Sequence, residues 1–188
     1  MSDSRALRLG PRSITTIAAT SLVGIIAFGW PLFAAPTSSV VAHAADAPWL
    51  FAIVVPLMLA VVVASFTDGG MDAKAIALLG VLAAVVSVLR PLGGGTVGIE
   101  PIWVVLVLGG RALGPGFGFA LGAVSLFASA LLTGGVGPWL PFQMLGAAWV
   151  GLGAGLLPRA SGRTEILLLA GYGAVASFAY GLLLNLWF

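Results

Sequence analysis

The stretch GGRALGPGFGFALGAVSLFASALL, residues 109–132, contains a single charged residue, Arg111, and a Gly-Pro-Gly break at residues 114–116. Backbone amides find no water to bond inside a bilayer, so the apolar chain on each side of the break should be helical. Gly114, Gly118 and Gly122 recur at every fourth position. Small residues on one helix face let two helices approach closely in lipid. The stretch therefore predicts two packed membrane helices joined by a tight turn.

The composition of the whole chain supports this prediction. Of its 188 residues, 60% are hydrophobic and 7% are charged, and the mean hydropathy is +1.15. Soluble domains carry about 25% charged residues, so the chain is a polytopic membrane protein that needs lipid around it. The net charge of +2 gives no indication of nucleic-acid binding, and the absence of cysteine excludes disulfides and thiolate metal sites.

Apolar runs separated by Gly, Pro and charged residues divide the chain into helices. A membrane-spanning helix needs about 20 apolar residues. The sequence predicts an all-α, polytopic transmembrane helix bundle with six to seven membrane-spanning helices. The predicted helices are residues 14–35, 49–67, 74–89, 101–113, 116–133, 139–157 and 164–188.

The basic residues predict the orientation, because Lys and Arg concentrate in cytoplasmic loops. If all seven helices cross and the N-terminal arginines lie inside, seven of the eight Lys and Arg residues lie inside and Arg90 alone lies outside. We expect a multi-pass protein of the plasma membrane, with a basic cytoplasmic segment at residues 1–13 and a single transmembrane domain at residues 14–188. The last apolar run continues to Phe188, so we expect the chain to be a fragment.

Small residues at four-residue spacing also occur on other predicted helices. Such a stripe either packs inside the bundle or docks a separate membrane subunit, and the first helix is the strongest candidate for docking. The further stripes are Thr16, Thr20 and Gly24; Ala147, Gly151 and Gly155; and Gly173, Ser177 and Gly181.

Residues 109–132, together with GVGPWLPFQMLGAAWVGLGAGLLP at residues 135–158, resemble the core of a transporter family. The family is the S components, the substrate-binding membrane subunits of energy-coupling factor (ECF) vitamin transporters. The resemblance covers roughly residues 95–160. It implies a six-helix membrane protein that binds a vitamin or related micronutrient from outside. It also implies three partners, a transmembrane coupling (T) subunit and two cytoplasmic ATPases.

The resemblance extends to the docking helix and to the ligand. In the family, an Ala-x-x-x-Ala stripe on the first helix contacts the coupling subunit. Here Thr16, Thr20 and Gly24 keep the small size without the alanines, and they are the expected docking residues. Cobalamin is the first expectation for the ligand by resemblance, followed by riboflavin, thiamine and biotin.

Polar and aromatic residues near the predicted outer ends of helices are candidates for ligand binding, because polar side chains inside a membrane are costly. Gln143 and Asn185 could instead form interhelical hydrogen bonds, Arg90 and Glu100 could form a surface ion pair, and Trp139 could lie in an interfacial belt. The candidates are Arg90, Glu100, Trp139, Gln143, Tyr180 and Asn185.

Enzymatic alternatives have weaker support. His43 is the only histidine, so a site with several histidines is excluded, and we expect no catalytic residue, metal or cofactor. Asp68 and Asp72 could hold Mg²⁺ in a membrane-embedded transferase, although Asp72 also suits the N-terminus of the following helix. The loop at residues 90–101 lacks the Gly-Lys-Ser or Gly-Lys-Thr of a phosphate-binding loop. A scaffold protein without a ligand is the remaining alternative.

Overall fold

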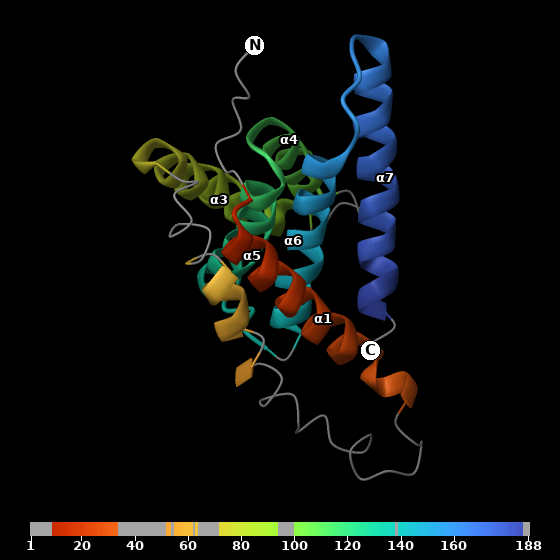
Figure 1. The fold of residues 1–188 in the computed structure, drawn as a ribbon. Helices are drawn as coiled ribbons and strands as arrows, with labels where there is room; N and C mark the ends of the chain where they lie inside the picture. Colours follow the sequence, from red (N-terminus) through yellow and green to blue (C-terminus); the bar gives the residue numbers. More distant parts are fainter. Residues whose placement is uncertain are drawn as a thin grey trace.

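Every element that the computed structural model describes is an α-helix (Figure 1). The described residues are 9–33, 52–53, 55–61, 63, 72–93, 100–137 and 139–185. The helices are α1 (Pro11–Phe33), α3 (Ala73–Gly93), α4 (Ile102–Leu113), α5 (Pro115–Thr133), α6 (Leu140–Leu156) and α7 (Arg163–Asn185), and residues 55–61 are also helical. The all-α prediction is confirmed, and the bounds of these six helices lie within about four residues of the predicted ones. Of the predicted helix at 49–67, residues 52–53, 55–61 and 63 are described, and all of them are helical.

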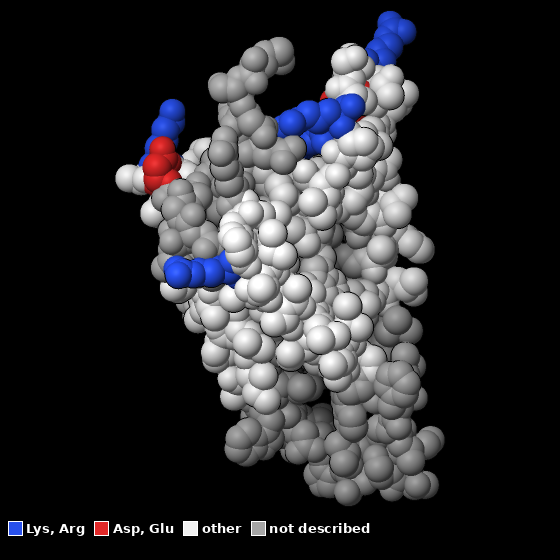
Figure 2. Space-filling model, in the orientation of Figure 1, with Lys and Arg blue, Asp and Glu red and all other residues white. Residues whose placement is uncertain are grey.

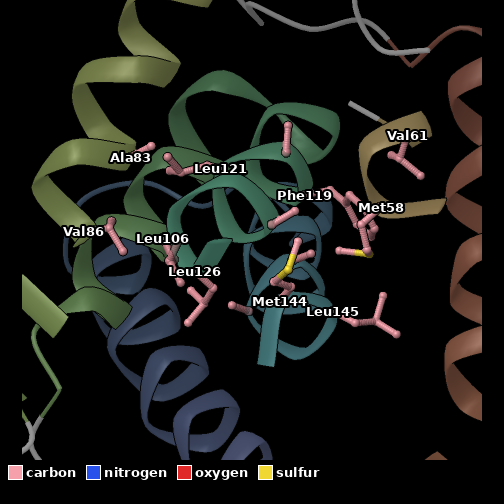
Figure 3. Packing of buried hydrophobic residues seen from close by; sticks show 14 of the residues in the cluster. Met58, Val61, Ala83, Val86, Leu106, Phe119, Leu121, Leu126, Met144 and Leu145 are labelled. Carbon is pink, nitrogen blue, oxygen red and sulfur yellow. The ribbon is translucent and has the colours of Figure 1, made fainter. Parts of the chain in front are cut away.

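Helices α5 and α6 form the centre of the bundle. Helix α5 packs against α3, α4 and α6, while α6 also contacts α1 and α7. Large side chains from α4, α5 and α6 meet in one core, where Leu106, Phe119, Leu126 and Met144 are almost completely buried (Figure 3). Met58, in the helical stretch at residues 55–61, belongs to the same cluster. A helix that is apolar on all sides is buried either in a protein core or in a membrane, and α5 is surrounded by α3, α4 and α6.

Glycines bring the backbones of the central helices into direct contact. A Cβ atom on Gly118 of α5 would overlap the carbonyl oxygen of Gly151 on α6, and a Cβ on Gly110 of α4 would overlap the same oxygen. One turn further along, a Cβ on Gly122 would overlap the backbone of Ala147. The two central stripes of small residues therefore pack inside the bundle, as one of the two predicted roles requires.

A one-residue connection joins α4 to α5. Gly114 has a φ of 103°, which residues with a side chain rarely adopt, and its N–H donates to the Gly110 carbonyl at 3.0 Å. Pro115 follows as the first residue of α5, a position where its missing N–H costs nothing. The predicted tight turn is confirmed, and it makes α4 and α5 neighbours.

Among the residues that the structure describes, four helical segments are long and apolar enough to cross a membrane: Pro11–Gly29, α3, α5 and α7. Helix α4 is shorter, and its 12 residues span about 18 Å at 1.5 Å per residue. The outer helices present large apolar side chains to their surroundings; on α7, Leu167 is 72% exposed and Phe178 is 78% exposed. Soluble proteins rarely expose continuous apolar surface of this kind, so we place this surface in lipid.

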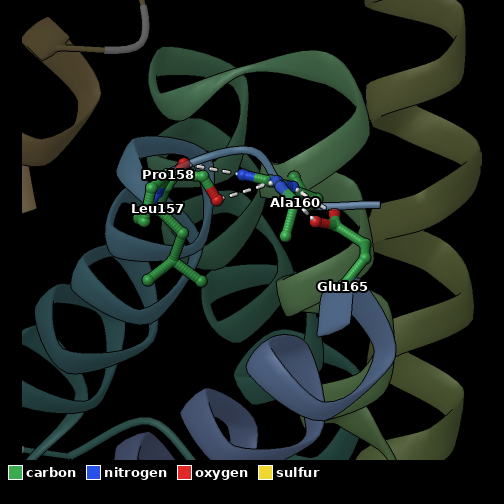
Figure 4. Close-up of polar contacts among 5 residues, drawn as sticks. Leu157, Pro158, Ala160 and Glu165 are labelled. Atoms are coloured by element: carbon green, nitrogen blue, oxygen red, sulfur yellow. Dashed lines mark hydrogen bonds and ion pairs between the residues drawn. The ribbon is translucent and has the colours of Figure 1, made fainter. Parts of the chain in front are cut away.

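Arg111 connects the end of α4 to the α6–α7 connection (Figure 4). Its guanidinium donates two hydrogen bonds to Glu165, at 2.6 and 2.8 Å, and others to the carbonyls of Leu157 at 2.7 Å and Pro158 at 3.1 Å. Glu165 also accepts the N–H of Ala160 at 3.0 Å. A bidentate arginine–carboxylate pair is among the stronger and more directional polar contacts in proteins, so these contacts fix how three helices meet.

The charged side chains on the face shown in Figure 2 gather on its upper part, toward the end where α6 leads into α7 in Figure 1. Arg111 lies at this end, beside the α6–α7 connection. Arg90 lies near the other end of α3, where it contacts the first turn of α6. Arg90 and Arg111 thus lie toward opposite ends of the bundle, as the predicted helix order requires.

Replacing Gly151 with valine tests the central packing. The new side chain would meet the backbones of α4 and α5, which cannot rotate away as a side chain can. Overpacking usually lowers the free energy of unfolding by about 1–3 kcal/mol, and we expect at least this loss here. The measurement is the melting temperature of the detergent-purified protein. Gly171→Val is the matched control, because a Cβ there has nothing within 4 Å. Equal melting temperatures for the two variants would contradict the close backbone contact.

Replacing Arg111 with glutamine tests the contacts at the α6–α7 connection. The change leaves Glu165 and two carbonyls without their charged donor, so we expect a lower melting temperature. The Glu165 side chain is 25% exposed, so water screens the pair and the decrease should be modest. Arg163→Gln removes an equal charge from the same region and should change the melting temperature little. A similar effect of both variants would count against the assigned role of Arg111.

Candidate ligand-binding site

A short hydrogen bond links two of the predicted site residues from distant parts of the chain. Arg90 lies in the last turn of α3 and Gln143 in the first turn of α6. The Nη2 of Arg90 donates to Oε1 of Gln143 at 2.6 Å, and both groups are partly buried. This is the interhelical hydrogen bond that the sequence left open as one role for Gln143. It uses one of the five N–H donors of the guanidinium.

Glu100 and Tyr180 complete the group around this bond. Glu100 lies just before α4, and burial raises its pKa although the Arg90 charge acts in the opposite direction. Burial therefore favours the neutral acid more than the nearby cation favours the carboxylate. The charges of Arg90 and Glu100 both reach Tyr180, near the end of α7. We call these four residues, Arg90, Glu100, Gln143 and Tyr180, the polar cluster.

The position of Tyr180 is set by glycine on one side and an aromatic ring on the other. A Cβ on Gly146 of α6 would lie 2.8 Å from Cδ2 of Tyr180, so the ring needs the space that glycine leaves. The ring of Trp103, in the first turn of α4, meets Tyr180 edge-on, with centroids 4.7 Å apart. Trp103 contacts the cluster although it was not among the predicted ligand residues. Its position three residues after Glu100 was the available signal.

A second tyrosine holds α7 to α6 two turns away. The Tyr172 hydroxyl donates to the Val150 carbonyl at 2.8 Å, and its oxygen occupies the space that a Cβ on Gly153 would fill. Apart from such contacts α7 is peripheral, and none of its described residues is fully buried. The two tyrosines therefore position α7 at the cluster.

Trp139 and Asn185 are the other two predicted ligand residues. The Trp139 carbonyl accepts the N–H of Gln143 at 3.0 Å, but no side-chain contact that the structure describes joins Trp139 or Asn185 to the cluster. Trp139 precedes α6, and its indole N–H donates to the Gly135 carbonyl at 3.3 Å. Asn185 is the last residue of α7 and is exposed. Their role in ligand binding stays a prediction.

The predicted docking stripe on α1 lies largely against the chain's own α6. Thr20 is 2% exposed, and a Cβ on Gly24 would overlap the Leu145 side chain. Thr16 is partly buried, and its hydroxyl donates to the Arg12 carbonyl at 2.8 Å. The exposed surface of α1 comes from other positions, which include Leu22, Ile25 and Ile26. Partner docking by the stripe stays a prediction.

Other contacts fix α1 on α6. The Trp149 indole N–H donates to the Ser21 hydroxyl at 2.9 Å. The Phe28 ring meets Phe142 edge-on at 4.7 Å between centroids. These contacts hold α1 beside the helix that supplies Gln143.

Buried serines near the cluster are a feature that the sequence analysis missed. Ser87, one turn before Arg90, donates to the carbonyls of Ala83 at 2.7 Å and Ser125 at 3.1 Å. The hydroxyls of Ser125 and Ser129 are buried and have no hydrogen-bond partner among the described residues. Two serines four residues apart in an apolar helix were the signal, because both lie on one face.

Asp72 caps a helix, as one of its two predicted roles requires. Its Oδ1 accepts the N–H of Ala75 at 2.8 Å, in the first turn of α3. Asp68 and His43 lie outside the described residues. Within the described part of the chain, no three His, Cys, Asp or Glu side chains are grouped so that they could hold a metal ion.

The fold and the cluster define the class of the protein, which is an α-helical membrane protein with a polar, partly buried site between helix ends. Residues 74–188 match the family described as ECF transporter, substrate-specific component. Since the match covers more than half of the chain, the chain belongs to this family, as the resemblance predicted. The members are transporter subunits and not enzymes. Searches of curated proteins and of solved structures gave no significant match.

Proposed function

We propose that this chain captures a vitamin or related micronutrient outside the plasma membrane and that partner subunits then import it with energy from ATP. The partners would be a transmembrane coupling subunit and two cytoplasmic ATPases. Membership of the family supports a substrate-specific transporter subunit. The observation that carries the proposal is the polar cluster, in which α3, α4, α6 and α7 meet.

The chemistry of the cluster suits capture. Arg90 and Gln143 are already joined, so a ligand that binds there meets donors that need little reorganisation. Electrostatic contacts are stronger in a partly buried site than in water. Trp103 and Tyr180 add apolar ring surface beside the charges, a combination that is typical of small-molecule sites.

The proposed orientation follows from the basic residues. Lys74, Arg111, Arg159 and Arg163 belong to the end that the positive-inside rule assigns to the cytoplasm. The cluster is then on the outer side, where a scavenged nutrient arrives, and the N-terminus is cytoplasmic.

The proposed contact with the coupling subunit is through α1. Thr20 and Gly24 keep α1 close to α6, so their substitution would act by displacing the helix. The apolar residues on the outer face of α1 are the accessible ones in this arrangement.

The ligand itself is best identified by mass spectrometry of material extracted from the purified protein. Cobalamin is the first candidate, and riboflavin, thiamine and biotin follow. Any bound compound should be released when the cluster is changed.

Gln143→Ala should weaken binding of the identified ligand by about tenfold or more, since a hydrogen bond to a charged group contributes about 1.5–3 kcal/mol. Removing the amide leaves Arg90 without the partner that orients it. The measurement is a titration of the purified protein, with the melting temperature recorded in parallel. Thr164→Ala, at the opposite end of α7, is the control. Unchanged affinity in a folded Gln143→Ala variant would remove Gln143 from the site.

The orientation can be tested with single cysteines, because the chain has none of its own. Val136→Cys, in the α5–α6 connection, should react with a membrane-impermeant maleimide on intact cells, because Val136 is 48% exposed. Ser161→Cys, two residues after Arg159, should react only after the cells are opened. The reverse pattern would overturn the orientation and, with it, capture from outside.

A further inference from the structure

A groove of about 320 Å³ lies between α4 and α7. Its volume is at the lower end of the range of about 300–1,000 Å³ for small-molecule sites. Its surface is mainly apolar, and the Ser177 hydroxyl in its lining already donates to the Ala174 carbonyl at 3.0 Å. An apolar group is therefore the suitable occupant. The groove exists because α7 contributes small residues there, among them Ala170, Gly173 and Ala174.

The groove adjoins the polar cluster at Trp103. The Trp103 side chain lines the groove, and its ring also meets Tyr180, a member of the cluster, at 4.7 Å. From there the lining follows α7 from Ser177 back to Leu169, a length of about 12 Å at 1.5 Å per residue. The groove thus begins one aromatic side chain away from the cluster.

The cluster offers charges of both signs to the polar end of such a molecule. Arg90 supplies N–H donors, while the Glu100 carboxyl lies close enough to feel the Arg90 charge. A head group with only an acceptor would use the Arg90 donors and leave the Glu100 carboxyl with the Arg90 charge alone, whereas a head that also carries a donor would add a hydrogen bond to Glu100. The best match is a head that presents an acceptor to Arg90 and a donor to Glu100.

We propose that the substrate is a small amphiphile whose zwitterionic or amide-containing head binds the polar cluster and whose apolar part lies in the groove between α4 and α7. This inference rests on the proposed capture function and narrows its substrate class to compounds smaller than cobalamin. A bilayer phospholipid is the competing occupant, and the groove is small for a molecule with two acyl chains.

The probe is 2-aminodecanoic acid, titrated calorimetrically into the full chain in phosphatidylglycerol nanodiscs, with empty nanodiscs as the blank. Decanoic acid and decylamine each lack one half of the head, and alanine lacks the tail. We expect 2-aminodecanoic acid to bind most tightly and each of the other three compounds to bind at least about tenfold more weakly, the loss expected for one charged hydrogen bond or several buried methylenes.

Two glycines of α7 give matched variants for the groove. A Cβ on Gly173 would point toward Val107 across the groove, 3.9 Å away, whereas a Cβ on Gly171 has nothing within 4 Å. Gly173→Leu should fill the groove and weaken binding of 2-aminodecanoic acid by at least about tenfold, while Gly171→Leu should leave it unchanged. Both substitutions favour the helix equally, so the melting temperatures should not fall.

Two results would contradict the proposed substrate class, and each would point to a different reason. Wild-type affinity in Gly173→Leu would show that the tail does not use the groove. Loss of binding when phosphatidylethanolamine replaces phosphatidylglycerol would assign the groove to a membrane lipid. In both cases, binding of an extracted nutrient that depends on Gln143 would leave the proposed function standing. If neither an extracted nutrient nor the probe binds, both proposals are wrong.

Discussion

The structure depends on the direct contact between the backbones of α5 and α6. Gly118 and Gly151 remove the side chains that would separate these helices, and Gly110 lets α4 reach the same point. Lipid supplies no hydrophobic force to hold helices together, so close approach and van der Waals contact must do so. Helix α6 then becomes the element against which α1, α4, α5 and α7 are placed. This explains why the glycine-rich segment of the sequence was the most informative about the fold.

The same packing creates the polar cluster. Because α4 is bound at its end by the Gly114 turn and the Arg111 contacts, its first turn is fixed as well, and Trp103 meets Tyr180. Gln143 sits at the beginning of the helix that the glycines hold in the centre, where Arg90 of α3 can reach it. The polar residues contribute their chemistry, but the glycines determine that these residues meet.

The sequence predicted most of the fold because hydrophobic run length and glycine–proline breaks are local features, and α4 and α5 were located almost to the residue. Four predicted ligand residues lie together. They were all predicted at the same end of the bundle, and helix ends on the same side of a membrane lie near one another. The direction in which a helix face points is a property of the whole bundle. For this reason the sequence could not show that Gly24 packs on Leu145, or that Trp103 meets Tyr180 instead of only facing the membrane interface.

Arg90 is the exception to the predicted charge distribution, and its contacts explain the exception. A guanidinium at a partly buried helix end is costly unless it has partners, and a lysine or arginine is unfavourable on the outer side by the positive-inside rule. Arg90 has Gln143 as an acceptor and the Glu100 carboxyl nearby. Those partners reduce the cost, yet an apolar residue at this position would avoid it altogether. A charge placed against the distribution, and compensated by Gln143 of α6 and by Glu100 before α4, fits the proposed recognition of a polar ligand better than a role in stability alone.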